Sequence, residues 1–115
     1  MNYYIYEVDI HAGHPFVEEA MEMFEEELEY AKERNVHVLK VVTGYGSRGG
    51  THRIQDELLM KLISLKCDGE IVDYIKGNEL SFHHSRLSNK LTRMIPANDK
   101  RIANPGVVYI FLRRS

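Results

Sequence analysis

The feature that most constrains the fold is a strand-like run that passes through a glycine-rich turn into a helical pattern. Residues 36–42, Val-His-Val-Leu-Lys-Val-Val, are rich in β-branched side chains and are bounded by Asn35 and Gly44, which predicts a buried strand. After the turn, apolar residues recur at helical spacing: Ile54, Leu58, Leu62 and Leu65. The chain therefore contains a strand-turn-helix connection, which is the building unit of an α/β domain.

Strand and helix patterns alternate along the rest of the chain. Residues 4–11 have strand chemistry, and Pro15 then opens an amphipathic helix. The apolar side chains of that helix are Val17, Ala20, Phe24, Leu28 and Ala31. Two short strands are expected at residues 71–75 and 107–112. Residues 1–115 are therefore expected to form one layered α/β domain with right-handed crossovers.

The connection between the last two strands, at roughly thirty residues, is too long for a structureless loop in a compact domain. We expect one helix over residues 82–95, ended by Pro96. Its apolar stripe comprises Leu87, Leu91 and Met94 or Ile95, and the basic row beside the stripe comprises Arg86, Lys90 and Arg93. This basic segment, about residues 80–103, is interpreted either as a solvated surface or as an arm that contacts a nucleic-acid backbone.

Composition narrows the class of protein. A chain of 115 residues with 43% hydrophobic side chains can bury a single core. The lone Cys67 has no partner for an internal disulfide, and no apolar run has the length of a membrane span. The first residues, Met-Asn-Tyr-Tyr, lack the basic start of a signal peptide. The expected location is the cytoplasm.

Charge is distributed unevenly along the sequence. Residues 1–33 hold ten acidic residues against Lys32 alone, and residues 34–115 hold fourteen Lys and Arg against seven acidic residues. The two parts therefore carry −9 and +7. A segregated basic half suits a polyanionic partner, but it could equally neutralise the acidic half within the fold or across a dimer.

The glycine-rich turn has the chemistry of an anion site. Its residues are Thr43, Gly44, Tyr45, Gly46, Ser47, Arg48, Gly49 and Gly50. Glycines let backbone N–H groups approach a ligand, and the following helix adds unpaired N–H groups, so phosphate is the expected ligand. The spacing also fits a G-x-G-x-x-G dinucleotide fingerprint, but the chain is too short for the usual two nucleotide-binding halves. A glycine-rich connection without a ligand stays open.

Two polar residues close the first strand. Asp9 and His11 are two positions apart and share a face if the strand continues to His11. If the first two strands are parallel neighbours, this strand end lies at the same sheet edge as the glycine turn. A carboxylate beside an imidazole can orient it for proton transfer next to a phosphate. The alternative is that the pair only caps the end of the strand.

Together these residues resemble the small MutS-related (Smr) domain family, which is defined by an LDxH motif and a later HGxG or TGxG motif. The resemblance rests on Val8-Asp9-Ile10-His11, on the helix containing Val17-Glu18-Glu19-Ala20, and on residues 43–50. It implies a two-layer α/β sandwich of βαβαββ type with a mixed sheet, to which the helix before the last strand is an addition. Members of the family bind DNA or RNA, and several are endonucleases.

Carried over by position, the resemblance implies that Asp9 and His11 are catalytic and that Thr43, Gly44 and Gly46 bind phosphate. The chain departs from the family at the loop after His11, and at Thr43, which stands where a histidine is commoner. The expected function is a nucleic-acid-binding endonuclease, and the alternative is a non-catalytic module that binds nucleic acid or a nucleotide. A divalent ion at Asp9, Mg²⁺ or Mn²⁺, and a homo-oligomer are left open.

Overall fold

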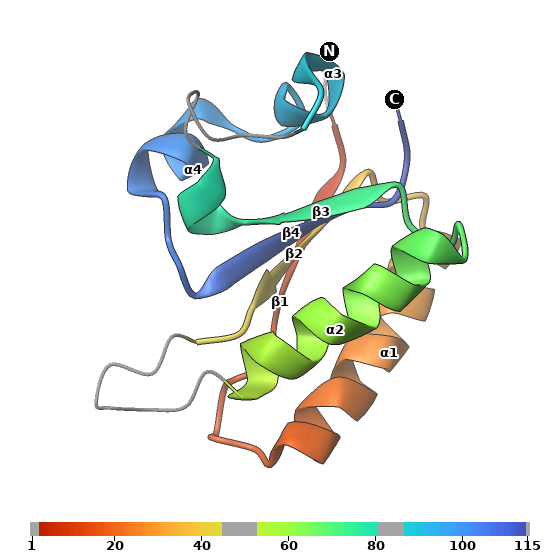
Figure 1. Ribbon diagram of the computed structural model, residues 1–115, viewed down its shortest axis with the longest axis vertical. Coiled ribbons are helices and arrows are strands. Elements are labelled where there is room, and N and C mark those ends of the chain that lie inside the picture. The colour runs from red at the N-terminus through yellow and green to blue at the C-terminus, as the bar shows by residue number, and fades with distance from the viewer. Residues whose placement is uncertain (1–2, 45–52, 81–86, 115) are drawn as a thin grey trace.

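The computed structural model describes residues 3–44, 53–80 and 87–114, and its elements alternate as expected (Figure 1). In chain order the elements are β1 (Ile5–Asp9), α1 (Val17–Glu33), β2 (Val38–Val42), α2 (Arg53–Cys67), β3 (Asp73–Lys76), the 3₁₀ helix η1 (Gly77–Glu79), α3 (Asn89–Thr92), α4 (Ala97–Ile102) and β4 (Val107–Phe111). The α/β class is confirmed.

The four strands form one mixed sheet in the order β1-β2-β4-β3. β1 and β2 are parallel, with Asp9 opposite Val42, and β4 runs antiparallel to both β2 and β3. The expected parallel pairing of the first two strands is therefore confirmed. As a result, the residues that follow β1 and β2 emerge at the same edge of the sheet.

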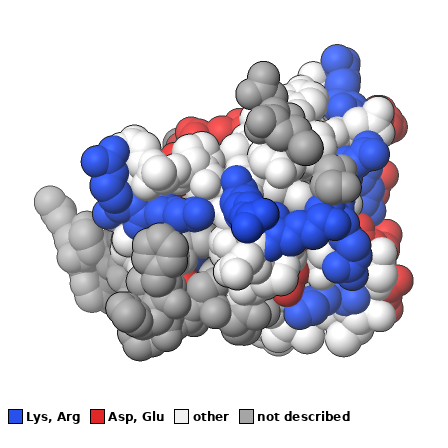
Figure 2. Space-filling model, turned by 90° about the horizontal axis from the view of Figure 1, so that it is seen from above, with Lys and Arg blue, Asp and Glu red and all other residues white. Residues whose placement is uncertain are grey.

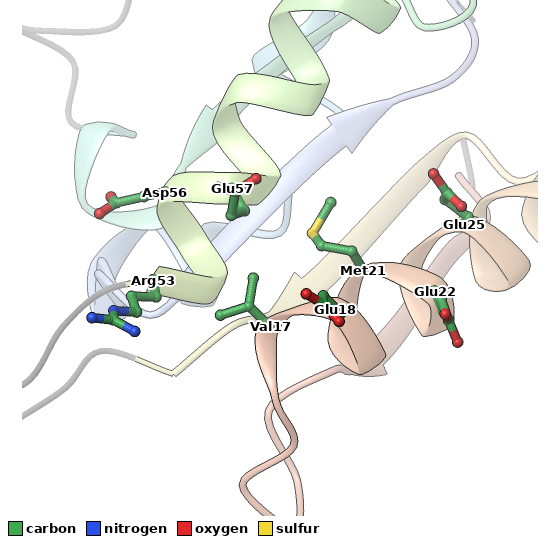
Figure 3. A pocket seen from close by; sticks show the side chains of 8 residues that line it. All are labelled: Val17, Glu18, Met21, Glu22, Glu25, Arg53, Asp56 and Glu57. Carbon is green, nitrogen blue, oxygen red and sulfur yellow. The ribbon is translucent and has the colours of Figure 1, made fainter.

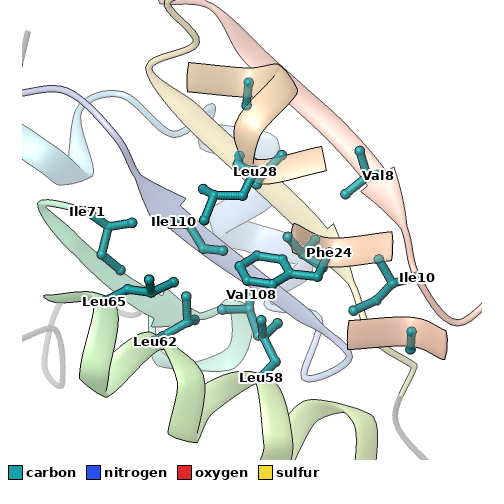
Figure 4. Packing of buried hydrophobic residues seen from close by; sticks show 14 of the residues in the cluster. Val8, Ile10, Phe24, Leu28, Leu58, Leu62, Leu65, Ile71, Val108 and Ile110 are labelled. Atoms are coloured by element: carbon teal, nitrogen blue, oxygen red, sulfur yellow. The ribbon is translucent and has the colours of Figure 1, made fainter. Parts of the chain in front are cut away.

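Helices α1 and α2 pack side by side on one face of this sheet (Figures 1 and 4). Alternate strand residues face these helices, because successive side chains of a strand point to opposite faces. The main members of this core are Val8, Ile10, Leu39, Val41, Val108 and Ile110 from the strands and their continuations, with Phe24, Leu28, Leu58, Leu62 and Leu65 from the helices. The helical spacings in the sequence therefore identify the buried faces of α1 and α2.

The additional segment between β3 and β4 covers the other face of the sheet. Its apolar residues Leu80, Leu87, Leu91, Met94 and Ile95 pack against Ile75, Val107, Tyr109 and Phe111. All the residues of the predicted apolar stripe are buried. The sheet thus has a helical pair on one side and this shorter segment on the other.

The prediction of a single helix over residues 82–95 is wrong. Helix α3 begins only at Asn89, because the Ser88 hydroxyl accepts a hydrogen bond from the Leu91 N–H at 3.4 Å and so caps the helix start. Pro96 is the N-terminal cap of the separate helix α4. The predicted basic row does not form on one helix, since Arg86 precedes the start of α3 and lies outside the described residues.

The uneven charge of the sequence separates the two faces of the sheet, because α1 is acidic and the segment before β4 is basic. α1 holds eight glutamates against Lys32, whereas residues 87–102 hold Lys90, Arg93, Lys100 and Arg101 against Asp99. Lys and Arg side chains gather on the end of the molecule where α3 and both termini lie (Figures 1 and 2). Within the part of the chain that the structure describes, no helix is long and apolar enough to cross a membrane.

Candidate functional site

The two candidate motifs meet at the sheet edge where β1 and β2 end. Ile10 N–H donates to the Val42 carbonyl at 3.0 Å, which extends the strand pairing one residue past β1. Gly44 has φ +72°, and a Cβ atom placed on it would lie 2.6 Å from the Cγ and Cδ2 atoms of His11. The imidazole therefore lies directly against the Gly44 backbone, a closeness that no other residue at position 44 would allow.

A short hydrogen-bonded turn holds His11 in this place. One oxygen of Asp9, Oδ1, accepts the N–H groups of His11 at 2.8 Å and Ala12 at 2.9 Å, and the His14 N–H donates to the His11 carbonyl at 3.0 Å. Gly13 and His14 both have left-handed backbone angles, with φ of +79° and +51°. Asp9 therefore positions His11 through its main chain, where the sequence suggested a direct contact with the ring.

The His11 side chain remains accessible from outside. His11 is half-buried and His14 is exposed, and their rings meet edge to face with centroids 5.1 Å apart. An imidazole that is fixed on one side by a backbone and open on the other can exchange a proton with a bound ligand. The arrangement thus combines a proton carrier with the start of a glycine-rich turn.

Thr43 has a buried side chain that is hydrogen-bonded within the fold. Its side chain is only 2% exposed, its hydroxyl donates to the Gly106 carbonyl at 3.0 Å, and its N–H donates to the same oxygen at 2.8 Å. The hydroxyl also accepts from Gln55 Nε2 at 3.1 Å. The Thr43 hydroxyl therefore supports the turn from the inside, and the predicted contact of Thr43 with phosphate stays a prediction.

Gln55 is a site-supporting residue that the sequence reasoning missed. It is 3% exposed and its Nε2 also donates to the Pro105 carbonyl at 2.7 Å, so it ties α2 to the end of β2 and to the approach to β4. Its spacing to Leu58 and Leu62 places it in the buried stripe of α2, and that polar interruption was the available signal. Gln55 thereby holds the two ends of the turn region in register.

The rest of the predicted phosphate turn, residues 45–50, lies outside the described residues, so a cradle of its backbone N–H groups with Arg48 stays a prediction. Lys90 and Arg93 are exposed on α3. In Figure 1, α3 lies at the opposite end of the sheet from the end of β2, so these two cations are not part of the His11 site. Among the described residues, no three His, Cys, Asp or Glu side chains are grouped as metal ligands.

A second polar cluster lies under α4, on the other face of the sheet. Lys40 Nζ is 2.9 Å from Asp99 Oδ2 and 3.3 Å from Glu7 Oε1, and the Tyr109 hydroxyl donates to Asp99 at 2.7 Å. Burial is the largest single influence and disfavours both charges, but the hydrogen bonds and charge attraction around the pair together outweigh it. The pKa of Asp99 is therefore lowered, with the Tyr109 hydroxyl contributing, and the pKa of Lys40 is raised, with Glu7 contributing. Burial and the bond to Asp99 also raise the pKa of Tyr109. The cluster anchors α4 to β2 and β4.

A groove of about 770 Å³ separates the first turns of α1 and α2 (Figure 3). Its lining combines two apolar side chains and one cation with five carboxylates, namely Val17, Met21, Arg53, Glu18, Glu22, Glu25, Asp56 and Glu57. Negative charges concentrated in a groove repel a polyanion. The groove between α1 and α2 is therefore an unfavourable path for a nucleic-acid backbone.

Comparison with solved structures identifies the fold. The chain is similar to the crystal structure of the Smr domain of Thermus thermophilus MutS2, with a TM-score of 0.57 and 18% sequence identity, over 94% of this chain and 98% of that one. The fold is that of an Smr domain. No protein-family model and no curated protein sequence matches the chain. In this Smr-like domain the LDxH and TGxG motif positions are joined through the contact of His11 with Gly44.

Proposed function

We propose that this Smr-like domain binds nucleic acid and cleaves its phosphodiester bonds, with His11 as the proton-transfer residue. The observation that carries the proposal is the His11 imidazole seated against Gly44, at the sheet edge where open α/β folds bind ligands. The contact supports this role because it brings an imidazole next to the first glycine of a glycine-rich turn that precedes a helix.

The distribution of charge supports a polyanionic ligand and restricts its path. Carboxylates line the groove between α1 and α2, while Lys and Arg gather around α3. A nucleic acid that contacts both the end of β2 and α3 has to run along the long axis of the molecule, whose full extent is 37 Å. Phosphate contacts made far from His11 would add affinity without taking part in cleavage.

In the proposed reaction the backbone amides of residues 44–50 and Arg48 hold one phosphate. His11 takes a proton from the attacking water or 2′-hydroxyl, whose oxygen forms a bond to phosphorus. The bond from phosphorus to the leaving oxygen breaks, and that oxygen takes a proton from the protonated His11 or from water. Asp9 keeps His11 in place through two backbone hydrogen bonds. The other carboxylate oxygen of Asp9 is the group that would contact Mg²⁺ or Mn²⁺. Cleavage is therefore to be measured with and without these ions.

A second candidate is a module of the same fold that binds nucleic acid without cleaving it. This candidate is favoured by Thr43, whose hydroxyl is buried and bonded within the fold at the position where the family more often has a histidine. The chain then has one acid-base group fewer at the site, and cleavage depends on His11 alone or with His14. Binding would still use the turn and the basic end of the molecule.

A cleavage panel separates the two candidates. Labelled single-stranded and duplex DNA and RNA are incubated with the wild-type chain, with and without Mg²⁺ or Mn²⁺, beside His11→Ala and, to test whether His14 contributes, His14→Ala. We expect His11→Ala to abolish cleavage while binding and unfolding temperature change little, because His11 is only half-buried. Loss of stability by about 1–3 kcal/mol without a specific loss of activity would mark His11 as structural.

The salt dependence of binding provides an independent check. Affinity for a nucleic acid falls steeply with salt, with a logarithmic slope of about −0.7 to −0.9 for each neutralised phosphate. Binding without cleavage but with such a slope selects the non-catalytic candidate. A flat dependence contradicts both candidates and favours a partner without a phosphate backbone.

A further inference from the structure

Phe16 is an exposed aromatic ring at the same end of the molecule as His11. It is 80% exposed, more than any other large hydrophobic side chain within the described residues. An apolar ring in water adds little to folding, because apolar groups stabilise a protein when they are buried. Single exposed apolar residues are common on proteins, so exposure alone does not indicate a function. A role for Phe16 therefore depends on where the ring lies relative to the proposed site.

The chain around Phe16 is held firmly. The Phe16 N–H donates to Glu19 Oε1 at 3.1 Å and its carbonyl accepts the Ala20 N–H at 3.0 Å, so the residue is anchored to the first turn of α1. Upstream, His14 keeps a left-handed backbone at φ +51° directly before Pro15, a conformation that costs energy for a side-chain-bearing residue. The backbone that carries the ring is therefore set before any ligand arrives, which lowers the entropy cost of binding.

The same loop links the ring to the proposed phosphate site. The His14 ring touches the His11 ring at a centroid distance of 5.1 Å, and two peptide units separate His14 from Phe16. Two such units span at most about 8 Å between Cα atoms. A ligand group next to a phosphate at His11 is within reach of the Phe16 ring.

The charges near Phe16 select which part of a nucleotide can approach it. Glu18 and Glu19 follow in the first turn of α1, and Glu18 also lines the acidic groove. These carboxylates repel a phosphate but not an uncharged base. A base presents its π-face to an aromatic ring only when that face is not covered by a neighbour in a duplex.

We propose that Phe16 stacks on an unpaired base adjacent to the phosphate held at His11. The substrates of this Smr-like domain are then single-stranded or locally unpaired nucleic acids. The inference rests on the proposed function, because it needs a nucleic acid at the site. It adds a residue that selects substrates by strand pairing and takes no part in the proton transfer.

The absence of tryptophan from the chain makes stacking directly observable. Phe16→Trp introduces a single tryptophan, whose emission can be excited apart from that of the tyrosines. Met60→Trp is the control at an exposed side chain on α2, 65% exposed. The probes are an oligothymidine of about 15 nucleotides, an abasic strand of the same length, and a blunt duplex. We expect oligothymidine to quench Phe16→Trp but not Met60→Trp, and the abasic strand and the duplex to quench neither.

Affinity measurements complete the test. Phe16→Ala should weaken oligothymidine binding by about fivefold to a hundredfold, the range for losing one stacked base, and should leave abasic-strand binding unchanged. Phe16→Tyr should restore the affinity. If wild type binds oligothymidine but Phe16→Trp is not quenched, or is quenched equally by the duplex, the inference about Phe16 fails while nucleic-acid binding stands. If wild type binds none of the three probes, the proposed function fails and the inference fails with it.

Discussion

Replacing Gly44 with alanine tests directly whether the His11 ring occupies the space next to the turn. Gly44 has φ +72°, and the added methyl group would lie 2.6 Å from two ring carbons of His11. Ordinary contacts begin at 3.4 Å, so the ring and the methyl group have to separate by a further 0.8 Å (3.4 − 2.6) to reach ordinary contact. The substitution therefore combines a backbone penalty with displacement of the proposed proton carrier.

Gly69 supplies the matched control for the backbone penalty. It has φ +77° and nothing within 4 Å of an added Cβ, so Gly69→Ala should cost about 1 kcal/mol, the typical penalty of a left-handed backbone. Gly44→Ala should cost about 2–4 kcal/mol, because overpacking against the ring adds about 1–3 kcal/mol. In a domain of this size each kcal/mol lowers the unfolding temperature by roughly 3–6 °C.

A double-mutant cycle measured by urea unfolding isolates the contact. Once His11→Ala has removed the ring, Gly44→Ala should cost no more than Gly69→Ala, so the two substitutions should show a coupling of about 1–3 kcal/mol. Cleavage by Gly44→Ala should be lost as it is in His11→Ala. Equal costs for Gly44→Ala and Gly69→Ala, together with additivity in the cycle, would refute the geometry on which the site rests.

Two further predictions concern the face of the sheet under α3 and α4. Asp99→Asn weakens the contacts of Asp99 with Lys40 and Tyr109 and should destabilise the fold by about 1–3 kcal/mol at pH 7. The folded-state pKa of Asp99 is lowered, so the stability that its carboxylate contributes is fully present above the unfolded-state pKa of about 3.9. That contribution is lost as the pH falls through the folded-state pKa. The difference in urea stability between Asp99→Asn and wild type should therefore shrink below about pH 4. Lys90→Glu with Arg93→Glu should weaken binding of a strand that spans the 37 Å molecule, and reduce its salt slope by about one unit per lost phosphate contact, but should leave dinucleotide binding unchanged.

The charge reversal on α3 has a control in the other layer. Lys61 lies on α2 and pairs with Glu25 at 2.9 Å, beside the acidic groove. Lys61→Glu should leave the salt slope of nucleic-acid binding unchanged. If reversal at Lys61 lowers the slope as much as reversal on α3, nucleic acid does not select the basic end, and the path proposed for the strand is wrong.

Part of the site follows from the sequence because strand order and sheet geometry place motif ends together. Parallel pairing of β1 and β2 carries residues 10–11 and 43–44 to one edge, so the meeting of His11 with Gly44 agrees with the reasoning from strand ends. The roles of Asp9 and Thr43 do not follow from spacing. Each depends on which backbone groups fold back within reach of its oxygen atoms, and for Thr43 the accepting carbonyl is at Gly106, sixty-three residues away.

In the segment before β4, the apolar pattern of the sequence predicts which residues are buried but not the helices that the backbone forms. Leu87, Leu91, Met94 and Ile95 are buried as their spacing predicts, but one continuous helix does not carry them. Periodicity reports which side chains face the core. Of these four residues only Leu91 lies within a helix, α3, and the irregular residues on either side of α3 bury the other three. The Ser88 cap stabilises a helix that starts at Asn89, and its free energy is comparable to the weak helical preference of so short a segment. The cap therefore favours a short α3 over one longer helix.

The sequence by itself determined the class of the fold, the positions of its strands and long helices, and the two motifs that end the parallel strands, because hydrophobic periodicity and glycine chemistry are local properties of the chain. Only the tertiary structure decided that Gln55 ties α2 to β2, that Lys40 meets Asp99 beneath α4, and that Phe16 stays outside the core. These outcomes depend on contacts between distant parts of the chain. A polar side chain is buried where the assembled fold supplies its partner, and that partner is invisible in the residues beside it.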